Sequence, residues 1–599
     1  MNRALTTATL VAFALCVLPL HASAQDGSNV LVVANAANAD SIRIAEYYAG
    51  KRGVPADQLL RLTSLPPDPA DGIDRLDFDR DIHAPIAAWL GRHQAQDRIL
   101  FIVLTKGVPL RINGPRGENT AASVDSELTL LYERLVGMTP ELEGPLPNPL
   151  FLGDGPLAKI ERFSREQSRL YLVTRLDGYT VDDVIGLIDR ASAPSTDGRF
   201  ILDGKRSLTD KGNQWLKAAA ERLTSTGLSA DRVVFDDTAR VVADQIDVLG
   251  YYSWGSNDPF IRRRDFNLTF RNGAIGGMFV STDGRTFREP PEGWTLPSWA
   301  NKEAWFAGSP QSLAGDLIRA GITGVAGHVA EPRLGNAIRP DILFPAYFAG
   351  LTLAEAYYRA MPSLSWMTVV VGDPLCKPFG GPPTRLADPP LDPETELPAT
   401  FSERRLARVG ENVPLAARKA LLRAESRTAR GDAEGARADL ERATHLAPSL
   451  TGAQFILASQ DEARGAFDEA IARYRTILEF APDSPLALNN LAYTLGVHKA
   501  DLRQALPLAR RAYQLAPNSG HIADTLGWLS LMSGDGKQAL ELLTRAAAMS
   551  PRVAEIRFHL AQVHAALGNA ESARTEMDQA VKLQPSMKER PEARAILEK

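Results

Sequence analysis

The first 380 residues alternate short apolar runs with stretches of helical periodicity. The runs at 30–33 (Val-Leu-Val-Val) and 99–104 (Ile-Leu-Phe-Ile-Val-Leu) have no polar positions, as strands buried on both faces require. The same pattern predicts ten strands, at 30–33, 59–62, 99–104, 170–173, 200–202, 232–235, 247–251, 275–280, 324–326 and 368–371.

Amphipathic segments fall between these strands and predict helices, at 42–48, 78–90, 180–191, 212–224, 312–319 and 353–361. Strands that alternate with helices and are apolar throughout predict an α/β fold, a three-layer sandwich with a mostly parallel sheet covered on both faces. Residues 111–160 are rich in Gly, Pro and Glu, and we expect them to form a long excursion over the strand ends.

From residue 415 onward the chain repeats itself about every 34 residues. Five prolines recur at spacings of 34, 35, 34 and 34, a small residue lies twelve positions before each, and glycine lies seventeen positions before four of them. The prolines are Pro448, Pro482, Pro517, Pro551 and Pro585, the small residues are Ala436, Ala470, Ala505, Ala539 and Ala573, and the glycines are Gly431, Gly465, Gly534 and Gly568, with Ala500 in the lengthened third repeat.

Each recurring position has a physical reason. A small side chain lets two antiparallel helices approach closely, glycine permits the turn between them, and proline ends the second helix. This pattern resembles the tetratricopeptide repeat, which implies that stacked helix pairs form an all-α superhelix with a groove for a protein or peptide. We expect about five repeats over 415–585, followed by a polar end cap at 586–599.

A proline-rich stretch at 381–401 separates the two patterns and is typical of an extended, semi-rigid linker. The predicted organisation is an α/β domain at 25–380, a linker at 381–401 and a repeat superhelix at 402–599. Because the linker offers few apolar side chains, we expect the two halves to fold independently. The net charge of -5 gives no overall attraction to nucleic acid or anionic lipid. The partner that the repeat resemblance implies is a protein or peptide in the groove.

Residues 1–24 have the pattern of a secretory signal peptide. Arg3 precedes a mostly apolar run at 4–20, and Ala22-Ser23-Ala24 fits the small-residue rule for cleavage. A membrane anchor is the alternative, but the run is short of the roughly 20 residues that a span needs. We therefore expect export to the periplasm or the medium, with no transmembrane segment after cleavage. Because Cys16 leaves with the signal, Cys376 has no partner for an intramolecular disulfide.

Six segments of the α/β half carry distinctive sequences, at 104–110 (Leu-Thr-Lys-Gly-Val-Pro-Leu), 246–258, 273–284, 321–332, 350–357 and 371–375. Together they resemble an uncharacterised bacterial family found alongside the exosortase protein-sorting system. The resemblance extends over about residues 28–380 and implies no assigned chemistry.

The order of these segments is also remotely similar to that of gingipain-like, caspase-fold cysteine peptidases. In those enzymes one strand ends in His-Gly and a second ends in the nucleophilic Cys, whereas Trp254-Gly255 and Ser281-Thr282 stand at the matching positions here. An indole N–H donates hydrogen bonds but cannot take a proton from a thiol. The resemblance therefore implies a caspase-like domain without a working dyad.

Other catalytic arrangements stay open. Ser281, His328 and Asp373 each follow a predicted strand, so they could converge at one edge of the sheet as the Ser–His–Asp triad of a hydrolase. Ser281 lacks the Gly-x-Ser-x-Gly elbow, and His328 and Asp373 equally suit bonding to neighbouring backbone. Cys376 suits the hydrophobic core better than a nucleophilic role.

Polar residues near the strand ends could also bind ligands. Glu331 and Glu355 could pair as catalytic carboxylates, although helix capping explains Glu355. Asn257, Asp258 and Asp283 could hold Ca²⁺, although turn chemistry explains them more simply. The sequence has neither HExxH nor CxxC nor a phosphate-binding glycine motif, so we expect no metal or nucleotide cofactor.

Two functions follow from these observations. The first is an exported scaffold, with a repeat groove for a partner and a non-catalytic α/β domain that recognises something at its strand-end cleft. The second is a hydrolase or peptidase that uses the same cleft. The candidate cleft residues are Trp254, Asn257, Asp258, Ser281, Asp283, Glu331 and Asp373.

The cleavage motif makes a direct prediction about the mature protein. Because Ala22-Ser23-Ala24 is the only small-residue site directly after the apolar run, the exported chain should begin at Gln25. Mass spectrometry of the protein recovered from the periplasm or medium measures this. Retention of residues 1–24 would show that the segment is an anchor instead.

Overall fold

The computed structural model describes residues 25–114, 120–139, 144–156, 161–207, 209–380 and 388–598. These form two compact units, one with residues up to Pro390 and Pro398–Phe401, the other with Leu391–Leu397 and the chain from Ser402 onward. The expected signal at 1–24 and residues 381–387 of the expected linker lie outside the described residues. Within the rest of that linker, Glu396 accepts hydrogen bonds from Arg427 and Arg430 of the helical unit.

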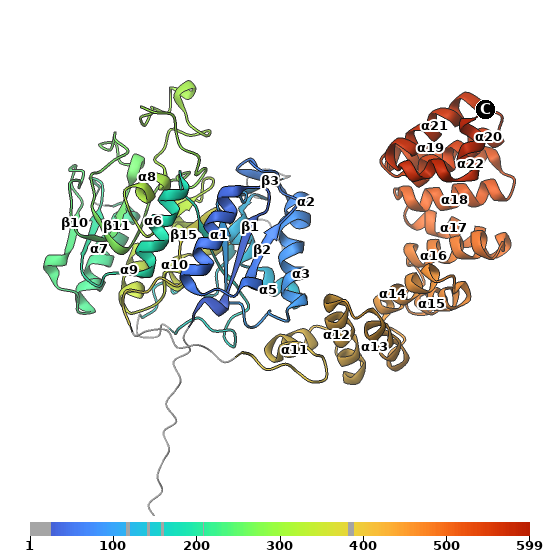
Figure 1. Ribbon diagram of the computed structural model, residues 1–599, viewed down its shortest axis with the longest axis horizontal. Coiled ribbons are helices and arrows are strands. Elements are labelled where there is room, and N and C mark those ends of the chain that lie inside the picture. Colours follow the sequence, from blue (N-terminus) through green and yellow to red (C-terminus); the bar gives the residue numbers. More distant parts are fainter. Residues whose placement is uncertain are drawn as a thin grey trace, which may run out of the picture. The chain divides into compact units, whose positions relative to one another are not determined.

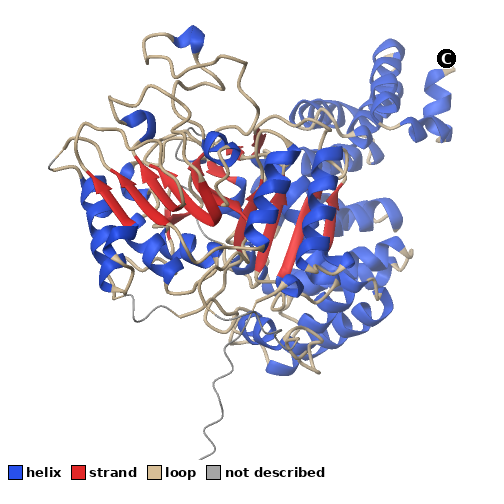
Figure 2. Cartoon of the chain, turned by 60° about the vertical axis from the view of Figure 1, so that its left-hand side comes forward, coloured by secondary structure: helices blue, strands red, loops and turns tan. Residues whose placement is uncertain are grey.

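The first unit is built on a ten-stranded, mostly parallel sheet in the order β10-β9-β11-β12-β13-β15-β8-β4-β1-β2 (Figure 2). The strands are β1 Val30–Asn35, β2 Leu59–Leu62, β4 Phe101–Thr105, β8 Leu172–Leu176, β9 Arg199–Asp203, β10 Val233–Asp236, β11 Val248–Ser253, β12 Phe270–Met278, β13 Gly324–His328 and β15 Thr368–Gly372. Each corresponds to one of the ten predicted strands, which confirms the α/β fold.

The sheet contains two groups of neighbouring strands, and within each group the strands are arranged in the same order. In the set β1, β2, β4, β8 and in the set β9, β10, β11, β12, β13, the first strand lies between the second and the third. Strand β15 is antiparallel to β13, with Gly372 opposite Gly324 and Thr368 opposite His328. Residues that follow β15 therefore lie at the edge of the sheet where β13 begins, away from the edge where β13 ends.

Helices cover both faces of the sheet (Figure 1). On one side α1 (Ala39–Arg52) packs beside α6 (Val181–Ser192), which packs beside α8 (Ala314–Arg319). A second group consists of α7 (Lys211–Ser225), α9 (Pro340–Phe348) and α10 (Leu353–Ala360). The sequence pattern did not predict α9, since almost all of its side chains are apolar and buried and no polar face marks its period.

The second unit consists of stacked helix pairs, each with a first helix, called A, and a second, called B. The pairs are α12 (Leu415–Arg430) with α13 (Ala433–Leu446), α14 (Thr451–Ala463) with α15 (Phe467–Phe480), α16 (Pro485–Tyr493) with α17 (Leu502–Leu515), α18 (Gly520–Met532) with α19 (Gly536–Met549), and α20 (Ala554–Ala566) with α21 (Ala570–Leu583). Helix α22 (Pro591–Leu597) follows the last pair, where the end cap was expected. The five predicted repeats are thus five helix pairs.

The recurring residues do what their positions predicted. Ala436, Ala470, Ala505, Ala539 and Ala573 are all buried, with at most 3% of their surface exposed. The four repeat glycines have φ between 74° and 90°, in the left-handed region that favours glycine, and Ala500 has φ of 53° at the same place. The extra residue of the third repeat is taken up by a π-helical turn at Thr494–His498.

Enlarging one of the buried alanines tests this packing. Ala539→Leu forces a larger side chain into the contact between α18 and α19, so it should lower the free energy of unfolding by about 1–3 kcal/mol. Glu541→Leu, at an exposed position of the same helix, should change it by no more than about 0.5 kcal/mol. Urea unfolding followed by the helical circular dichroism signal compares the two variants, and equal midpoints would refute the assigned register.

Candidate functional site

The carboxyl ends of β11, β12 and β13 bring several of the predicted residues to one edge of the sheet. Trp254, directly after β11, is buried and packs on Phe279 with ring centroids 4.8 Å apart. Its indole N–H donates to Asn213 Oδ1 at 2.8 Å, and Lys205 Nζ lies 3.5 Å from the centroid of its ring. Trp254 is therefore a packed wall of the site and has no atom that could accept a proton.

His328 and Asp283 meet at the same edge. The backbone N–H of His328 donates to Asp283 Oδ1 at 2.8 Å, and its Nδ1 lies 2.9 Å from the carbonyl oxygen of Val280. His328 is buried and its Nε2 has no hydrogen-bond partner among the described residues. Ser281 is half-buried, and its hydroxyl likewise has no partner in the described part of the chain. The histidine and the serine thus belong to the ends of neighbouring strands but are not joined by a hydrogen bond.

Asp373 does not join them. Because β15 runs antiparallel to β13, Asp373 lies at the opposite edge of the sheet from His328. Its fully buried carboxylate accepts hydrogen bonds from the Tyr48 hydroxyl at 2.8 Å and from Arg52 Nε at 2.5 Å. The structure therefore does not assemble Ser281, His328 and Asp373 into a triad, and Asp373 instead anchors the end of α1.

The other candidate residues have local structural roles. Glu355 forms a capping box with Thr352 at the start of α10, as its position suggested. Glu331 is exposed and accepts the backbone N–H of Arg333 at 2.7 Å. Cys376 is fully buried, and that burial raises the pKa of its thiol to about 12, so the thiol is protonated at neutral pH. None of these groups is poised as a nucleophile or base.

A cavity of about 480 Å³ opens beyond the ends of β11 and β12. The amides of Asn257 and Gln311 form part of its lining. Gln311 donates to Asn257 Oδ1 at 3.0 Å and accepts a hydrogen bond at 2.7 Å from Thr282, which lies behind the lining. Its rim includes Trp299, which is 61% exposed, and Arg262. Amide and hydroxyl groups beside an exposed indole suit the binding of a ligand.

Buried Arg285 holds this wall of the cavity in place. Its guanidinium donates to the carbonyl oxygens of Thr282, Phe306, Ser309 and Gln311. Burial lowers the pKa of Arg285 to about 10, and the side chain remains charged at neutral pH. The segment after β12 is thus held in its conformation by hydrogen bonds from the buried Arg285 guanidinium to its backbone carbonyl groups.

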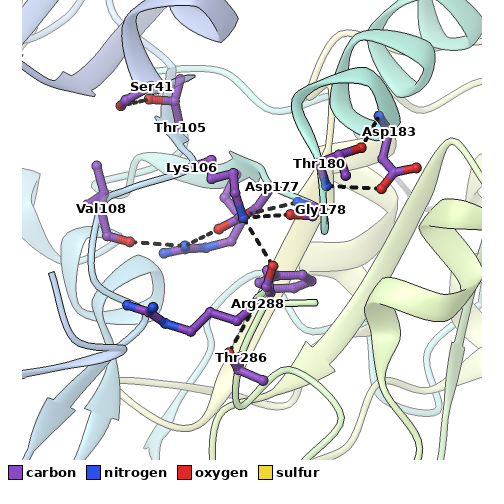
Figure 3. A network of polar contacts seen from close by, with 12 residues as sticks. Ser41, Thr105, Lys106, Val108, Asp177, Gly178, Thr180, Asp183, Thr286 and Arg288 are labelled. Carbon is purple, nitrogen blue, oxygen red and sulfur yellow. Dashed lines mark hydrogen bonds and ion pairs between the residues drawn. The ribbon is translucent and has the colours of Figure 1, made fainter. Parts of the chain in front are cut away.

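A second polar network at the same edge was not singled out by the sequence (Figure 3). Lys106 Nζ, after β4, donates to the carbonyl oxygens of Gly178 at 2.7 Å and Phe287 at 3.0 Å, and lies 3.5 Å from Asp177 Oδ1. Lys106 therefore connects the loops after β4, β8 and β12. The available signal was its place directly after a buried strand, within the segment 104–110 that carries the family resemblance.

Arg175 of β8 is fully buried and holds the loops next to the Lys106 network in place. It forms ion pairs with Asp125, at the start of α4 (Val124–Leu128), at 2.5 Å and with Asp177 at 3.3 Å. Its guanidinium also donates to the carbonyl oxygens of Val108 and Pro109. Removing one member of such a cluster leaves a buried charge unpaired, which typically costs about 3–5 kcal/mol.

A group of carboxylates lies at the ends of β9 and β10. Asp203 and Asp258 are each only 2% exposed. Burial raises the pKa of Asp203 to about 7, and the charges of Asp258 and Asp236 add to the effect, while the backbone N–H of Val242 opposes it. Asp258 is held by turn bonds, with Oδ1 accepting the N–H of Phe260 at 2.8 Å. Within the described residues no cluster of His, Cys, Asp and Glu could hold a metal ion.

The repeat unit offers a different kind of site. Among the A helices, α16 contacts α18 and α18 contacts α20, so these helices lie side by side. Elements that approach one another in a curved stack lie on its inner side, and the inner side of such stacks forms an extended binding surface. We call this surface, formed by α14, α16, α18 and α20, the inner face. In the described residues no helix has the length and hydropathy that a membrane span requires.

Comparisons with known proteins identify the repeat class. Residues 530–599 match the family model of the tetratricopeptide repeat. Similar solved structures are a thermophilic repeat protein of Thermus thermophilus (20% identity, 31% of this chain and 100% of that one, TM-score 0.26), YrrB, a repeat protein with an unusual peptide-binding site (19%, 33% and 98%, 0.27), and PilF of Pseudomonas aeruginosa (20%, 30% and 87%, 0.25). No curated protein matches the chain. The C-terminal half is a tetratricopeptide repeat region, a class that mediates protein–protein interaction.

The pKa of Asp203 makes the stability of the α/β half depend on pH. Folded Asp203 keeps its proton up to about pH 7, whereas an unfolded Asp releases it near about pH 3.9. Between these values the folded state binds more protons, so stability falls as pH rises through this window. Asp203→Asn has no carboxyl group to ionise, so its free energy of unfolding should not fall over this pH range. At pH 8 the variant should be more stable than the unmodified protein by up to about 3–4 kcal/mol, with little difference near pH 4.

Thermal unfolding followed by tryptophan fluorescence measures this, because seven of the eight tryptophans lie in the α/β half. The matched control is Asp237→Asn, at an exposed position directly after β10. A stability difference between Asp203→Asn and the unmodified protein that does not grow with pH would contradict the raised pKa.

Proposed function

We propose that this protein is an exported scaffold that binds a partner protein or peptide on the inner face of its repeats. In this proposal its α/β half is a caspase-like domain without catalytic activity. The observation that carries the proposal is the stack of five helix pairs, whose small residues are buried at every predicted position and whose last part matches the tetratricopeptide repeat model.

Two features support the non-catalytic interpretation of the α/β half. Trp254 stands after β11, where gingipain-like peptidases have the histidine of their dyad, and its ring is enclosed by Phe279 and Lys205. Ser281 stands after the neighbouring strand β12 without a hydrogen bond to a base among the described residues. The cavity at this edge is lined by apolar side chains together with the amides of Asn257 and Gln311 and two serines, which favours recognition of a ligand over its hydrolysis.

The proposed location outside the cytoplasm rests on the signal-like segment 1–24 and on the resemblance to the exosortase-associated family. Both are sequence arguments. They support a periplasmic or secreted protein that takes part in the sorting or handling of other exported proteins.

A hydrolase is the alternative, and the observation that favours it is the unpartnered Nε2 of buried His328. If Ser281 is not activated, a fluorophosphonate probe should not label the mature protein above the level seen with Ser281→Ala. Intact mass and peptide mapping read the result. Labelling of Ser281 that the substitution abolishes would establish the hydrolase instead.

Photo-crosslinking tests the scaffold function directly. Leu486 of α16 is 55% exposed and lies one helical turn from Asn489 and Asn490, so a photoreactive residue there should crosslink a partner in the exporting cell. The matched control places the same residue at exposed Glu541 of α19, a B helix, where we expect no specific adduct. Adducts of equal yield at both positions, or none at Leu486, would reject the inner face as the binding surface.

A further inference from the structure

Basic residues divide unequally between the two helices of the second to fifth repeats. The B helices α15, α17, α19 and α21 carry nine lysines and arginines, whereas the A helices α14, α16, α18 and α20 carry one, Arg557. Arg557 is itself paired, at 2.7 Å, with Glu576 of α21. The inner face is therefore almost without basic side chains of its own.

Carboxylates from three A helices gather on this face around Tyr493. Glu462 comes from α14, Asp524 from α18 and Glu555 from α20. Glu555 Oε1 lies 3.5 Å from His559 Nε2, and Nδ1 of the same ring lies 2.9 Å from Asp524 Oδ1. Glu462 accepts a hydrogen bond from the hydroxyl of Thr494, the residue after Tyr493. In agreement with this arrangement, burial raises the pKa of the Tyr493 phenol and the three carboxylates raise it further, while Arg590 opposes them. Residues far apart in the sequence thus form one acidic patch.

Only one member of the patch is paired with an arginine. Glu555 accepts two hydrogen bonds from Arg590, at 2.8 and 2.9 Å. Glu462 is bonded to the hydroxyls of Tyr474 and Thr494, and Asp524 is bonded to His559 Nδ1 at 2.9 Å. Among the described residues neither Glu462 nor Asp524 has a lysine or arginine within ion-pair distance. The charges of half-buried Glu462 and of Asp524, whose side chain is 12% exposed beside His559, are therefore left for a basic ligand to balance.

An unsatisfied buried group points to the same place. Asn489 lies one helical turn before Tyr493 on α16, has 9% of its surface exposed, and its Oδ1 has no hydrogen-bond partner among the described residues. Its Nδ2 donates to Asn490 Oδ1 at 3.2 Å, so the amide is held with its oxygen free. A buried acceptor without a donor is uncommon and lowers the stability of the folded state by about 1–3 kcal/mol. A hydrogen bond from a backbone N–H of an extended ligand would remove this penalty.

Aromatic rings complete the surface. Trp528 of α18 is half-buried and stacks on His559 with ring centroids 4.3 Å apart, and Tyr493 of the neighbouring helix α16 is half-buried as well. The faces of tryptophan and tyrosine attract ammonium and guanidinium groups, by about 0.5–2 kcal/mol. Carboxylates, aromatic faces and a free amide oxygen together suit one kind of ligand.

We propose that the inner face between α14 and α20 binds an extended segment of a partner protein that carries lysine or arginine side chains. Its basic groups contact Glu462 and Asp524 and the rings of Tyr493 and Trp528, and its backbone donates to Asn489. The arginine-rich first A helix, α12, lies outside this patch, with Arg423 and Arg427 paired to Asp439. This inference rests on the proposed scaffold function and specifies the chemistry of its partner.

Fluorescence anisotropy with the mature protein tests the preference. The probe is a flexible Gly-Ser peptide interspersed with lysines, compared with the same peptide carrying glutamates. The lysine peptide should bind at least about tenfold more tightly, and its affinity should fall when NaCl is raised from about 0.05 to about 0.3 M. Equal binding of the two peptides would overturn the proposal.

Variants locate the binding on the inner face. The double variant Glu462→Gln/Asp524→Asn should weaken binding of the lysine peptide at least about tenfold. Glu541→Gln/Asp578→Asn changes the net charge equally at exposed positions of two B helices and should alter affinity less than about twofold. Glu462→Gln alone leaves the buried Asp524–His559 pair intact and should give an intermediate loss of affinity. This single variant shows whether the weaker binding of the double variant comes from the lost charges or from misfolding. Equal losses in the two double variants would show non-specific charge attraction and reject the site.

The outcome is separable from that of the scaffold proposal. Crosslinks at Leu486 together with no preference for lysine would mean that the inner face binds a partner of other chemistry. Absence of crosslinks at Leu486 would reject the inner face as the surface that binds a partner in the cell, whatever the peptide result.

Discussion

The repeat half depends on the close approach of two antiparallel helices at one small residue in each pair. Ala436, Ala470, Ala505, Ala539 and Ala573 are all buried at this contact, and the left-handed turn that follows each A helix brings the B helix back against it. A larger residue would separate the pair and, through it, the neighbouring pairs, because each repeat is stabilised mainly by the next. The contact between successive A helices, and hence the inner face, is a consequence of this packing.

In the α/β half, two buried arginines and the half-buried Lys106 organise the ends of the strands. Arg175 pairs with Asp125 and Asp177, Lys106 bonds to two carbonyl groups, and Arg285 bonds only to backbone oxygens of the segment that it fastens. Each charge is satisfied by several partners, as burial requires. These residues hold loops from different strands in fixed positions. Such an arrangement fixes the shape of this edge of the sheet.

Much of the fold could be predicted from local pattern. All ten strands of the main sheet were predicted because strands buried on both faces are apolar at every position. Helix α9 was missed for the same physical reason, since a helix without a polar face shows no period. The site was predicted only in part: Trp254, Ser281, Asp283 and His328 do follow neighbouring strands to one edge, but Asp373 does not, because the direction of β15 cannot be read from its own five residues.

The amino-acid sequence by itself determined the repeat register, the number of helix pairs, the strands and the absence of a histidine after β11. These properties depend on residues close together in the chain, where the steric needs of a turn or the period of a helix act directly. Only the tertiary structure decided which side chains meet. The Lys106 network, the ion cluster of Arg175 and the acidic patch around Tyr493 each combine residues from elements far apart in the sequence, and no local pattern specifies the distances between them.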